Sequence, residues 1–215
     1  WSSMDNTPSY VTNGLVLNLD AGNLNSYSGS GATWADLAQD GNDGTINGAT
    51  YDSNGHFTFN GSNNYVDCGS SPITSNSVFS WEAWIYPSST GTPFFLGVES
   101  NNQAMVSYWD ASNSKVRVGV WGSDKLTSNT AISGGWGHTC WTWDGTTLRA
   151  YTNGAADGDV TGFSFNIANN YMMVGSTYAT QRFGGKIGTV KLYDKVLTAA
   201  EVLSNYNATK TRFGL

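Results

Sequence analysis

Carboxylates that could drive hydrolysis are few in this sequence. Cleavage of a glycosidic bond needs two carboxyl groups flanking it, about 5 Å apart in retaining enzymes and roughly 6.5–9.5 Å apart in inverting ones. The chain has three glutamates, Glu82, Glu99 and Glu201. Glu82 lies in strand-like sequence, but the positions two and four residues further on, which share its face of a strand, carry no carboxylate. An aspartate from another strand would have to complete a pair, so we expect a protein that is not an enzyme.

Histidine and cysteine form no recognisable catalytic or metal-binding pattern. His56 and His138 are the only histidines, and the sequence lacks the Gly-x-Ser-x-Gly turn of a serine hydrolase. A hydrogen-bonded structural role is favoured for His138 over the role of a base or a ligand. Cys68 and Cys140 fit no metal-ligand spacing and lie in strand-like segments, where a buried free thiol is the common state. A single disulfide between them stays open, because their geometry decides it.

Oxygen-bearing side chains in the loops raise the question of a bound cation. Calcium takes about six to eight oxygen ligands, and the loops of this chain are rich in Asp and Asn. Asp20 and Asn23, which follow directly on a strand-like run, are the candidate ligands for Ca²⁺. The alternative is that Asp20 only caps its own turn, which is a common role of aspartate.

Aromatic residues supply the strongest candidate for a binding site. The flat face of an aromatic ring packs against the C–H groups of a pyranose, while amides and carboxylates hydrogen-bond its hydroxyls. The candidate rings and their polar partners are Trp84, Tyr86, Tyr108, Trp109 and Trp121, with Glu82, Arg117 and Asn101. Each ring could instead pack the protein core. The prediction is therefore an exposed cluster, which a structure with all five rings buried would contradict.

Composition and charge exclude several kinds of partner. Of the 215 residues 12% are charged, and the formal net charge of −6 comes with only 10 Lys and Arg. These cations form no basic cluster, which disfavours nucleic acid and anionic membranes as partners. Apolar runs such as 94–98 are far shorter than the roughly 20 residues of a membrane-spanning helix, so we expect no membrane insertion. No signal peptide is visible, and the start at Trp1 rather than Met indicates a processed product or a piece of a longer chain.

Short strands separated by tight turns must position these residues. Asn-Gly and Asp-Gly pairs recur along the chain, and both tolerate the positive φ of hairpin turns. Between them, alternating apolar and polar residues predict strands at 14–20, 56–60, 65–68, 78–86, 104–110, 115–121, 138–143, 148–153, 171–175 and 186–193. Thr198 and Glu201 form a capping-box pattern ahead of apolar residues at helical spacing, which predicts a short C-terminal helix. A polar leader at 1–13 thus precedes a single all-β domain at 14–215.

Several segments, in order along the chain, resemble those of one family. Residues 57–66 (FTFNGSNNYV) are similar to an F-D-G-x-x-D-Y-V hairpin, and residues 79–87 (FSWEAWIYP) to an F-T-V-x-A-W-V-x-P strand. The remaining similarities are those of 136–145 to W-H-H-V-A-x-T-Y-D-G, of 151–154 to Y-V-N-G, and of 183–201 to F-x-G-x-I-D-E-V-R-I-Y-x-x-x-L-S-x-x-E. With these segments the chain resembles the laminin-G-like, concanavalin A-like lectin/glucanase family. The resemblance implies an all-β jelly-roll sandwich of two antiparallel sheets with a short C-terminal helix.

The resemblance also implies where ligands would lie. One face of the 78–86 strand, assigned to the core between the sheets, carries Phe79, Trp81, Ala83 and Ile85. The other face, which would be concave and ligand-facing by likeness to the family, carries Ser80, Glu82, Trp84 and Tyr86. Both faces carry a tryptophan, so the reverse assignment stays open. Many relatives hold calcium with the Asp of G-x-I-D, but Gly188 stands at that position here and provides no carboxylate.

A narrower likeness concerns the source of the domain. Residues 19–23 and 205–215 resemble versions of the fold in virion proteins of bacteriophages, notably marine ones. We therefore expect a non-enzymatic carbohydrate- or surface-binding domain of a virion appendage, such as a capsid knob, horn or tail fibre, that contacts host-surface glycans. The alternatives are a purely structural decoration protein that binds other virion proteins, and a lectin-like module of a secreted bacterial protein. All three place the domain on a virion surface or outside the cell.

Overall fold

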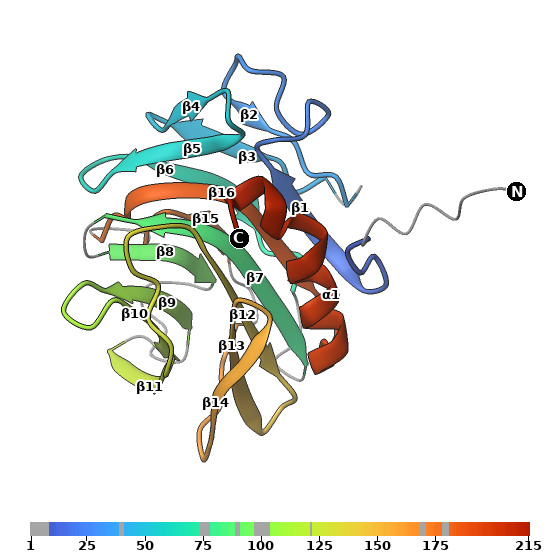
Figure 1. Ribbon diagram of the computed structural model, residues 1–215, viewed down its shortest axis with the longest axis vertical. Coiled ribbons are helices and arrows are strands. Elements are labelled where there is room, and N and C mark those ends of the chain that lie inside the picture. Colours follow the sequence, from blue (N-terminus) through green and yellow to red (C-terminus); the bar gives the residue numbers. More distant parts are fainter. Residues whose placement is uncertain are drawn as a thin grey trace, which may run out of the picture.

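Two antiparallel sheets lie face to face in the computed structural model of the chain (Figure 1). The structure describes residues 9–38, 41–73, 78–88, 91–96, 104–120, 122–167, 171–177 and 181–215. Sheet A consists, in order, of β14 (Ala155–Thr161), β13 (Thr147–Thr152), β12 (Gly137–Trp143), β7 (Phe79–Pro87), β16 (Gly184–Tyr193), β5 (His56–Asn60) and β4 (Thr50–Asp52), and β1 (Leu15–Asp20) also pairs with β16. Sheet B consists, in order, of β11 (Ser123–Thr127), β10 (Lys115–Val120), β9 (Met105–Asp110), β8 (Gly91–Leu96), β15 (Tyr171–Val174), β6 (Tyr65–Ser70), β3 (Gly44–Asn47) and β2 (Thr33–Trp34). The predicted jelly-roll sandwich is confirmed.

The chain ends in α1 (Ala199–Thr209) and the 3₁₀ turn η1 (Lys210–Phe213). The predicted capping box is present, because Thr198 Oγ1 accepts a hydrogen bond from Glu201 N at 3.2 Å and Glu201 Oε2 accepts one from Thr198 N at 2.8 Å. These bonds satisfy backbone donors that the first helical turn would otherwise leave unpaired. Within the described parts of the chain, no helix is long and apolar enough to cross a membrane.

Aromatic stacking joins the two sheets across the central core. The predicted core face of β7 is confirmed, since Phe79, Trp81, Ala83 and Ile85 are all buried in one cluster with residues of sheet B. The Trp81 ring stacks with those of Trp141 and Phe94, with centroids 6.3 and 6.5 Å away. Its Nε1 donates to Ser107 Oγ on β9 at 3.1 Å, which satisfies the one polar group of the ring.

The outer face of sheet A is covered by the C-terminal helix, which Figure 1 shows in red across the strands. The Trp84 ring stacks with Phe213 at 4.3 Å and with Tyr206 at 5.7 Å between centroids. Trp84 Nε1 donates to Thr209 Oγ1 at 2.8 Å, and the residue is only 1% exposed. The prediction that this face of β7 is open to a ligand is therefore wrong for Trp84, because aromatic residues of the last two turns of the chain pack over it.

Glu82, on the same face, is also buried rather than presented to solvent. Lys191 Nζ donates to its Oε1 at 2.8 Å, and Asn205 Nδ2 of α1 donates to its Oε2 at 2.9 Å. His138 Nε2 lies 3.3 Å from Oε2, so strands β7, β12 and β16 and the helix meet at one carboxylate. Burial alone would raise the pKa of Glu82, but the charge of Lys191 and the contact with His138 outweigh it and hold that pKa below its usual range. His138 is buried in contact with Glu82, which agrees with the expected structural role, but neither of its ring nitrogens meets hydrogen-bond geometry within the described residues.

The two cysteines lie in different layers. Cys68 belongs to the core between the sheets, whereas Cys140 belongs to the cluster under α1. Both thiols are free and buried. Of the two alternatives, the structure therefore shows free thiols, and burial raises the pKa of Cys140 well above its usual value, which keeps that thiol protonated.

We expect Trp84→Ala to lower the free energy of unfolding by about 3–5 kcal/mol, because it leaves a cavity under α1 that the stacked rings cannot fill. Urea denaturation measures the loss. Tyr86→Ala, two residues along the same face and only partly buried, is the matched control and should cost clearly less. Equal losses in the two variants would contradict the burial of Trp84.

We expect Glu82→Gln to destabilise the fold by about 3–5 kcal/mol at pH 7, because it leaves the Lys191 charge buried without a counter-charge. The folded-state pKa of Glu82 lies below its ordinary value of 4.5, so the stabilisation by the carboxylate is complete above that value and is lost as pH falls through the folded-state pKa. The difference between the wild type and Glu82→Gln should therefore shrink below about pH 4.5. Urea denaturation from pH 7 to pH 3 checks this, and a difference independent of pH would count against it.

Candidate functional site

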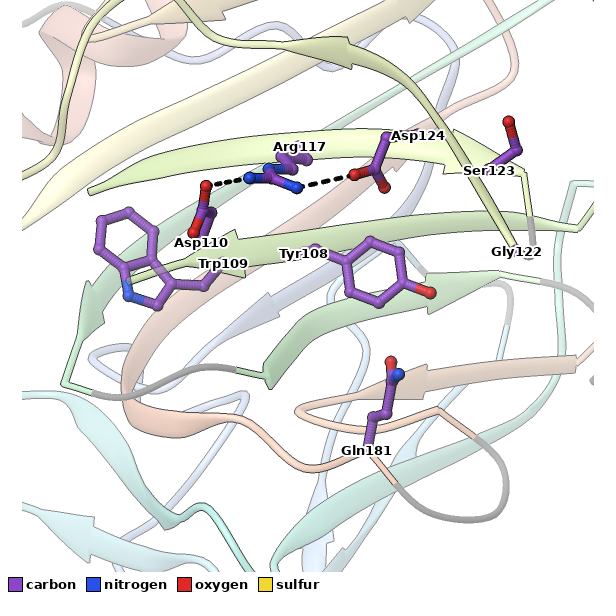
Figure 2. A pocket seen from close by; sticks show the side chains of 8 residues that line it. All are labelled: Tyr108, Trp109, Asp110, Arg117, Gly122, Ser123, Asp124 and Gln181. Atoms are coloured by element: carbon purple, nitrogen blue, oxygen red, sulfur yellow. Dashed lines mark hydrogen bonds and ion pairs between the residues drawn. The ribbon is translucent and has the colours of Figure 1, made fainter. Parts of the chain in front are cut away.

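A pocket of about 370 Å³ lies on the side of sheet B where β9, β10 and β11 run together (Figure 2). Its lining residues are Tyr108, Trp109, Asp110, Arg117, Gly122, Ser123, Asp124 and Gln181. The first three belong to β9, Arg117 to β10, and Ser123 and Asp124 to β11, while Gln181 belongs to the segment before β16. A hairpin, an edge strand and a distant loop therefore build the site together.

Strand alternation explains why these side chains point away from the core. Tyr108 and Arg117 are directly paired across the β9–β10 ladder. Their neighbours Trp109, Val116 and Val118 are buried in the core between the sheets. Because successive side chains of a strand point to opposite faces, Tyr108 and Arg117 project from the outer face of sheet B.

The Arg117 guanidinium lies between two carboxylates, as the dashed lines in Figure 2 show. Its Nη1 lies 3.0 Å from Asp124 Oδ2, and its Nη2 donates to Asp110 Oδ2. Asp110 also accepts hydrogen bonds from Asn113 Nδ2 at 2.6 Å and from Ser112 N at 3.0 Å. The bonds from Asn113 and Arg117 lower the pKa of Asp110, so this carboxylate is held ionised and in one orientation.

Tyr108 forms an aromatic wall of the pocket. In Figure 2 its ring lies between Arg117 and Gln181. Burial, and secondarily the charge of Asp124, raise the pKa of Tyr108 above its usual value. The phenol is therefore neutral at ordinary pH and can both donate and accept a hydrogen bond.

The structure brings together only part of the site predicted from the sequence. Tyr108 and Arg117 share the pocket, and Trp109 lines it with a small part of a ring that is otherwise buried, with 6% of the residue exposed. Tyr86 is partly exposed on sheet A, where its ring meets Trp136 edge-on at 5.9 Å. It does not line the pocket, and neither do Glu82 and Trp84. Trp121 and Asn101 lie outside the described residues.

Five pocket residues escaped the sequence analysis, namely Asp110, Gly122, Ser123, Asp124 and Gln181. The signal for Asp110 was present, because it lies two residues after Tyr108 and so on the same face of the predicted 104–110 strand. Ser123 and Asp124 lie on β11, whose sequence SDKLT shows no clear alternation of apolar and polar residues. Gln181 is brought in from a distant part of the chain, for which the sequence carries no local signal.

Asp20 and Asn23 do not fit a calcium ion. Asp20 Oδ1 accepts a hydrogen bond from Gly22 N at 2.9 Å and lies 2.5 Å from Arg212 Nη1, while Asn23 Oδ1 accepts one from Asn25 N at 2.9 Å. The guanidinium thus supplies the positive charge and fills the space that a cation beside Asp20 would take. Across the described parts of the chain, no three His, Cys, Asp or Glu side chains gather in a group that could hold a metal. The alternative role of Asp20, as the cap of its own turn, is confirmed.

The C-terminal residues also explain the glycine at position 188. A Cβ at Gly188 would lie 2.5 Å from the ring of Phe213, so no side chain fits there without moving the ring. Arg212, next to it, donates to the carbonyl oxygen of Gly55 at 2.6 Å. Phe213 therefore packs against the position at which the family pattern considered in the sequence analysis has an aspartate, and Gly188 supplies no carboxylate there.

Solved structures with the same fold include a domain of an arabinanase, part of a sialidase and a pentraxin. Domain 4 of AbnA, an extracellular arabinanase from Geobacillus stearothermophilus solved with arabinotriose, superposes with a TM-score of 0.71 at 22% identity, over 89% of this chain and 98% of that one. A sialidase from Trypanosoma rangeli solved with sialic acid gives a TM-score of 0.70 at 14% identity, over 93% of this chain and 33% of that one. The present chain thus spans about a third of the sialidase. A pentraxin from Limulus polyphemus gives a TM-score of 0.56 at 17% identity, over 69% of this chain and 79% of that one.

At these identities the structural matches show the fold alone. No curated protein matches the sequence. A family model, described as the concanavalin A-like lectin/glucanases superfamily and of the laminin-G type, matches residues 60–203. This match covers more than half of the chain and includes β7, β9, β10 and β11, so the chain belongs to the concanavalin A-like lectin/glucanase superfamily.

Proposed function

We propose that this domain binds glycans in the pocket on sheet B and does not cleave them. The observation that carries the proposal is the pocket, in which an aromatic ring, a guanidinium, two carboxylates and an amide line one hollow of about 370 Å³. The arabinotriose complex of the similar arabinanase domain, 98% of which this chain covers, supports it. The outer face of sheet A is covered by α1 and η1, so the residues under them are not accessible to a glycan.

The side chains that line the pocket are of the kinds that contact the C–H groups and the hydroxyls of a sugar. The face of Tyr108 can pack against the C–H groups of a pyranose, and Asp124, Ser123 and Gln181 can hydrogen-bond its hydroxyls. The ion pairs of Arg117 with Asp110 and Asp124 fix these groups before a ligand arrives. Such preorganisation lowers the entropy lost on binding.

The carboxylates of the pocket are unsuited to glycoside hydrolysis. A glycosidase needs one carboxyl group with a raised pKa that delivers a proton to the leaving oxygen. Asp110 has a lowered pKa, and Asp124 is ion-paired with Arg117. Glu82 is buried under α1 with Lys191 and cannot reach a substrate. We therefore expect a bound glycan to be recovered intact.

We expect Tyr108→Ala to weaken glycan binding at least tenfold, because it removes the ring on which the sugar packs. The experiment is a glycan-array screen of the purified domain, followed by titration of the best ligand with the wild type and the variant. Tyr86→Ala is the matched control, since Tyr86 is a partly exposed tyrosine on sheet A and should leave the affinity unchanged. A loss with Tyr86→Ala and none with Tyr108→Ala would contradict the assignment of the site to sheet B.

We further propose that the domain is displayed on a bacteriophage virion appendage, where it meets host-surface glycans. The likeness of residues 19–23 and 205–215 to phage virion proteins supports this. These two segments are joined in the fold by the ion pair between Asp20 and Arg212, so the likeness concerns one structural unit.

Antibodies against the domain should label an appendage of purified phage particles in electron micrographs. Label confined to the interior of cells would contradict a virion role. A purely structural decoration protein would also label particles, but it would bind no glycan on the array, so the two experiments together separate the alternatives.

A further inference from the structure

We infer that the pocket on sheet B selects uncharged sugars and rejects sugars that bear a carboxylate. The inference rests on the proposed function, because it names the class of ligand for the same site. It follows from the charges that line the pocket and from how they are already paired.

The charged groups of the lining carry an excess of negative charge. Among the described residues, Asp110, Asp124 and Arg117 are the charged side chains that line the pocket, two carboxylates against one guanidinium. An acidic sugar would add another carboxylate next to these. Like charges at a few ångströms repel, and the repulsion is stronger in a partly desolvated hollow than in bulk water.

Arg117, the one cationic side chain among the described residues that line the pocket, is ion-paired with two aspartates. Recognition of a carboxylate by arginine depends on its paired N–H groups, which donate two parallel hydrogen bonds. In this pocket the two terminal nitrogens of Arg117 donate to two different aspartates, Nη1 to Asp124 and Nη2 to Asp110. A ligand carboxylate that took either of these two positions on Arg117 would displace an aspartate and leave it uncompensated beside the ligand.

Two lysines lie near the pocket, but neither of them lines it. Lys125 neighbours Asp124 on β11, but its Nζ lies over the Phe163 ring, 5.8 Å from the centroid, and it lines a different pocket together with Phe163. The same Nζ donates a hydrogen bond to Ser123 Oγ at 3.0 Å, so this ammonium contacts one lining residue without lining the pocket itself. Lys115 is paired with Asp110 across the ladder and does not line the pocket.

Asp124 is the residue that we expect to contribute most to the preference for uncharged sugars. Its Oδ2 accepts a bond from Arg117, whereas its Oδ1 accepts none within the described part of the chain, and the side chain is 43% exposed. This exposed carboxylate oxygen can accept a hydrogen bond from a sugar hydroxyl, whereas a sugar carboxylate has no hydrogen to donate to it. Asp110 contributes less, because it is 10% exposed and accepts bonds from Asn113, Ser112 and Arg117.

The test compares neutral oligosaccharides with the same oligosaccharides oxidised at C6 to uronic acids, titrated against the intact domain. We expect each neutral ligand to bind at least tenfold more tightly than its oxidised counterpart, and the gap to narrow at high salt as the repulsion is screened. In Asp124→Asn, which keeps the shape and removes the charge, the gap should shrink several-fold. Asp159→Asn makes the same charge change at an exposed position on β14 of sheet A and should leave the gap intact.

Thermal melting establishes that both variants fold. Equal or tighter binding of the oxidised sugars to the wild type would overturn the inference while leaving glycan binding itself standing. A gap that persists unchanged in Asp124→Asn would overturn the role of Asp124. Binding of neither class would instead contradict the proposed function.

Discussion

A carboxylate buried as fully as that of Glu82 is stable only when charge and hydrogen bonds surround it on every side. Its partners here come from separate parts of the chain, Lys191 from β16, His138 from β12 and Asn205 from α1. The helix therefore contributes more than apolar packing, because its Asn205 donates one of the hydrogen bonds to the buried carboxylate of Glu82. Trp84, two residues along β7, is sealed by the same helix and by Phe213.

The C-terminal helix covers the outer face of sheet A, and this determines where the molecule can bind a ligand. With its outer face occupied by the chain's own C-terminus, the candidate site lies on sheet B, where the β9–β10 hairpin and β11 hold Tyr108, Arg117 and two aspartates around one hollow. The same C-terminal segment places Arg212 at Asp20 and Phe213 against Gly188. The Arg212 guanidinium thus occupies the position beside Asp20 that a metal ion would take.

Ten of the strands, the C-terminal helix and the core face of β7 could be predicted from the sequence, because local alternation, turn pairs and a capping box report them directly. The strands β2, β3, β4, β8, β11 and β14 were not predicted. The covered face of sheet A could not. Trp84 and its partner Thr209 lie 125 residues apart, and Asp20 and Arg212 lie 192 apart, so no local pattern links them. Tyr108 and Arg117 were candidates by residue type, as a ring and a polar partner, and the β9–β10 hairpin pairs them in the structure, whereas Asp124 and Gln181 join them from other elements.

The central claim is that a glycan contacts the outer face of sheet B and leaves the covered face of sheet A untouched. Hydrogen–deuterium exchange of the domain, with and without a saturating concentration of its best glycan ligand, tests this directly. The account predicts that amides of residues 105–127 become protected while those of α1 and β7 exchange as before. Protection confined to α1 and β7, with none in β9, β10 or β11, would contradict it.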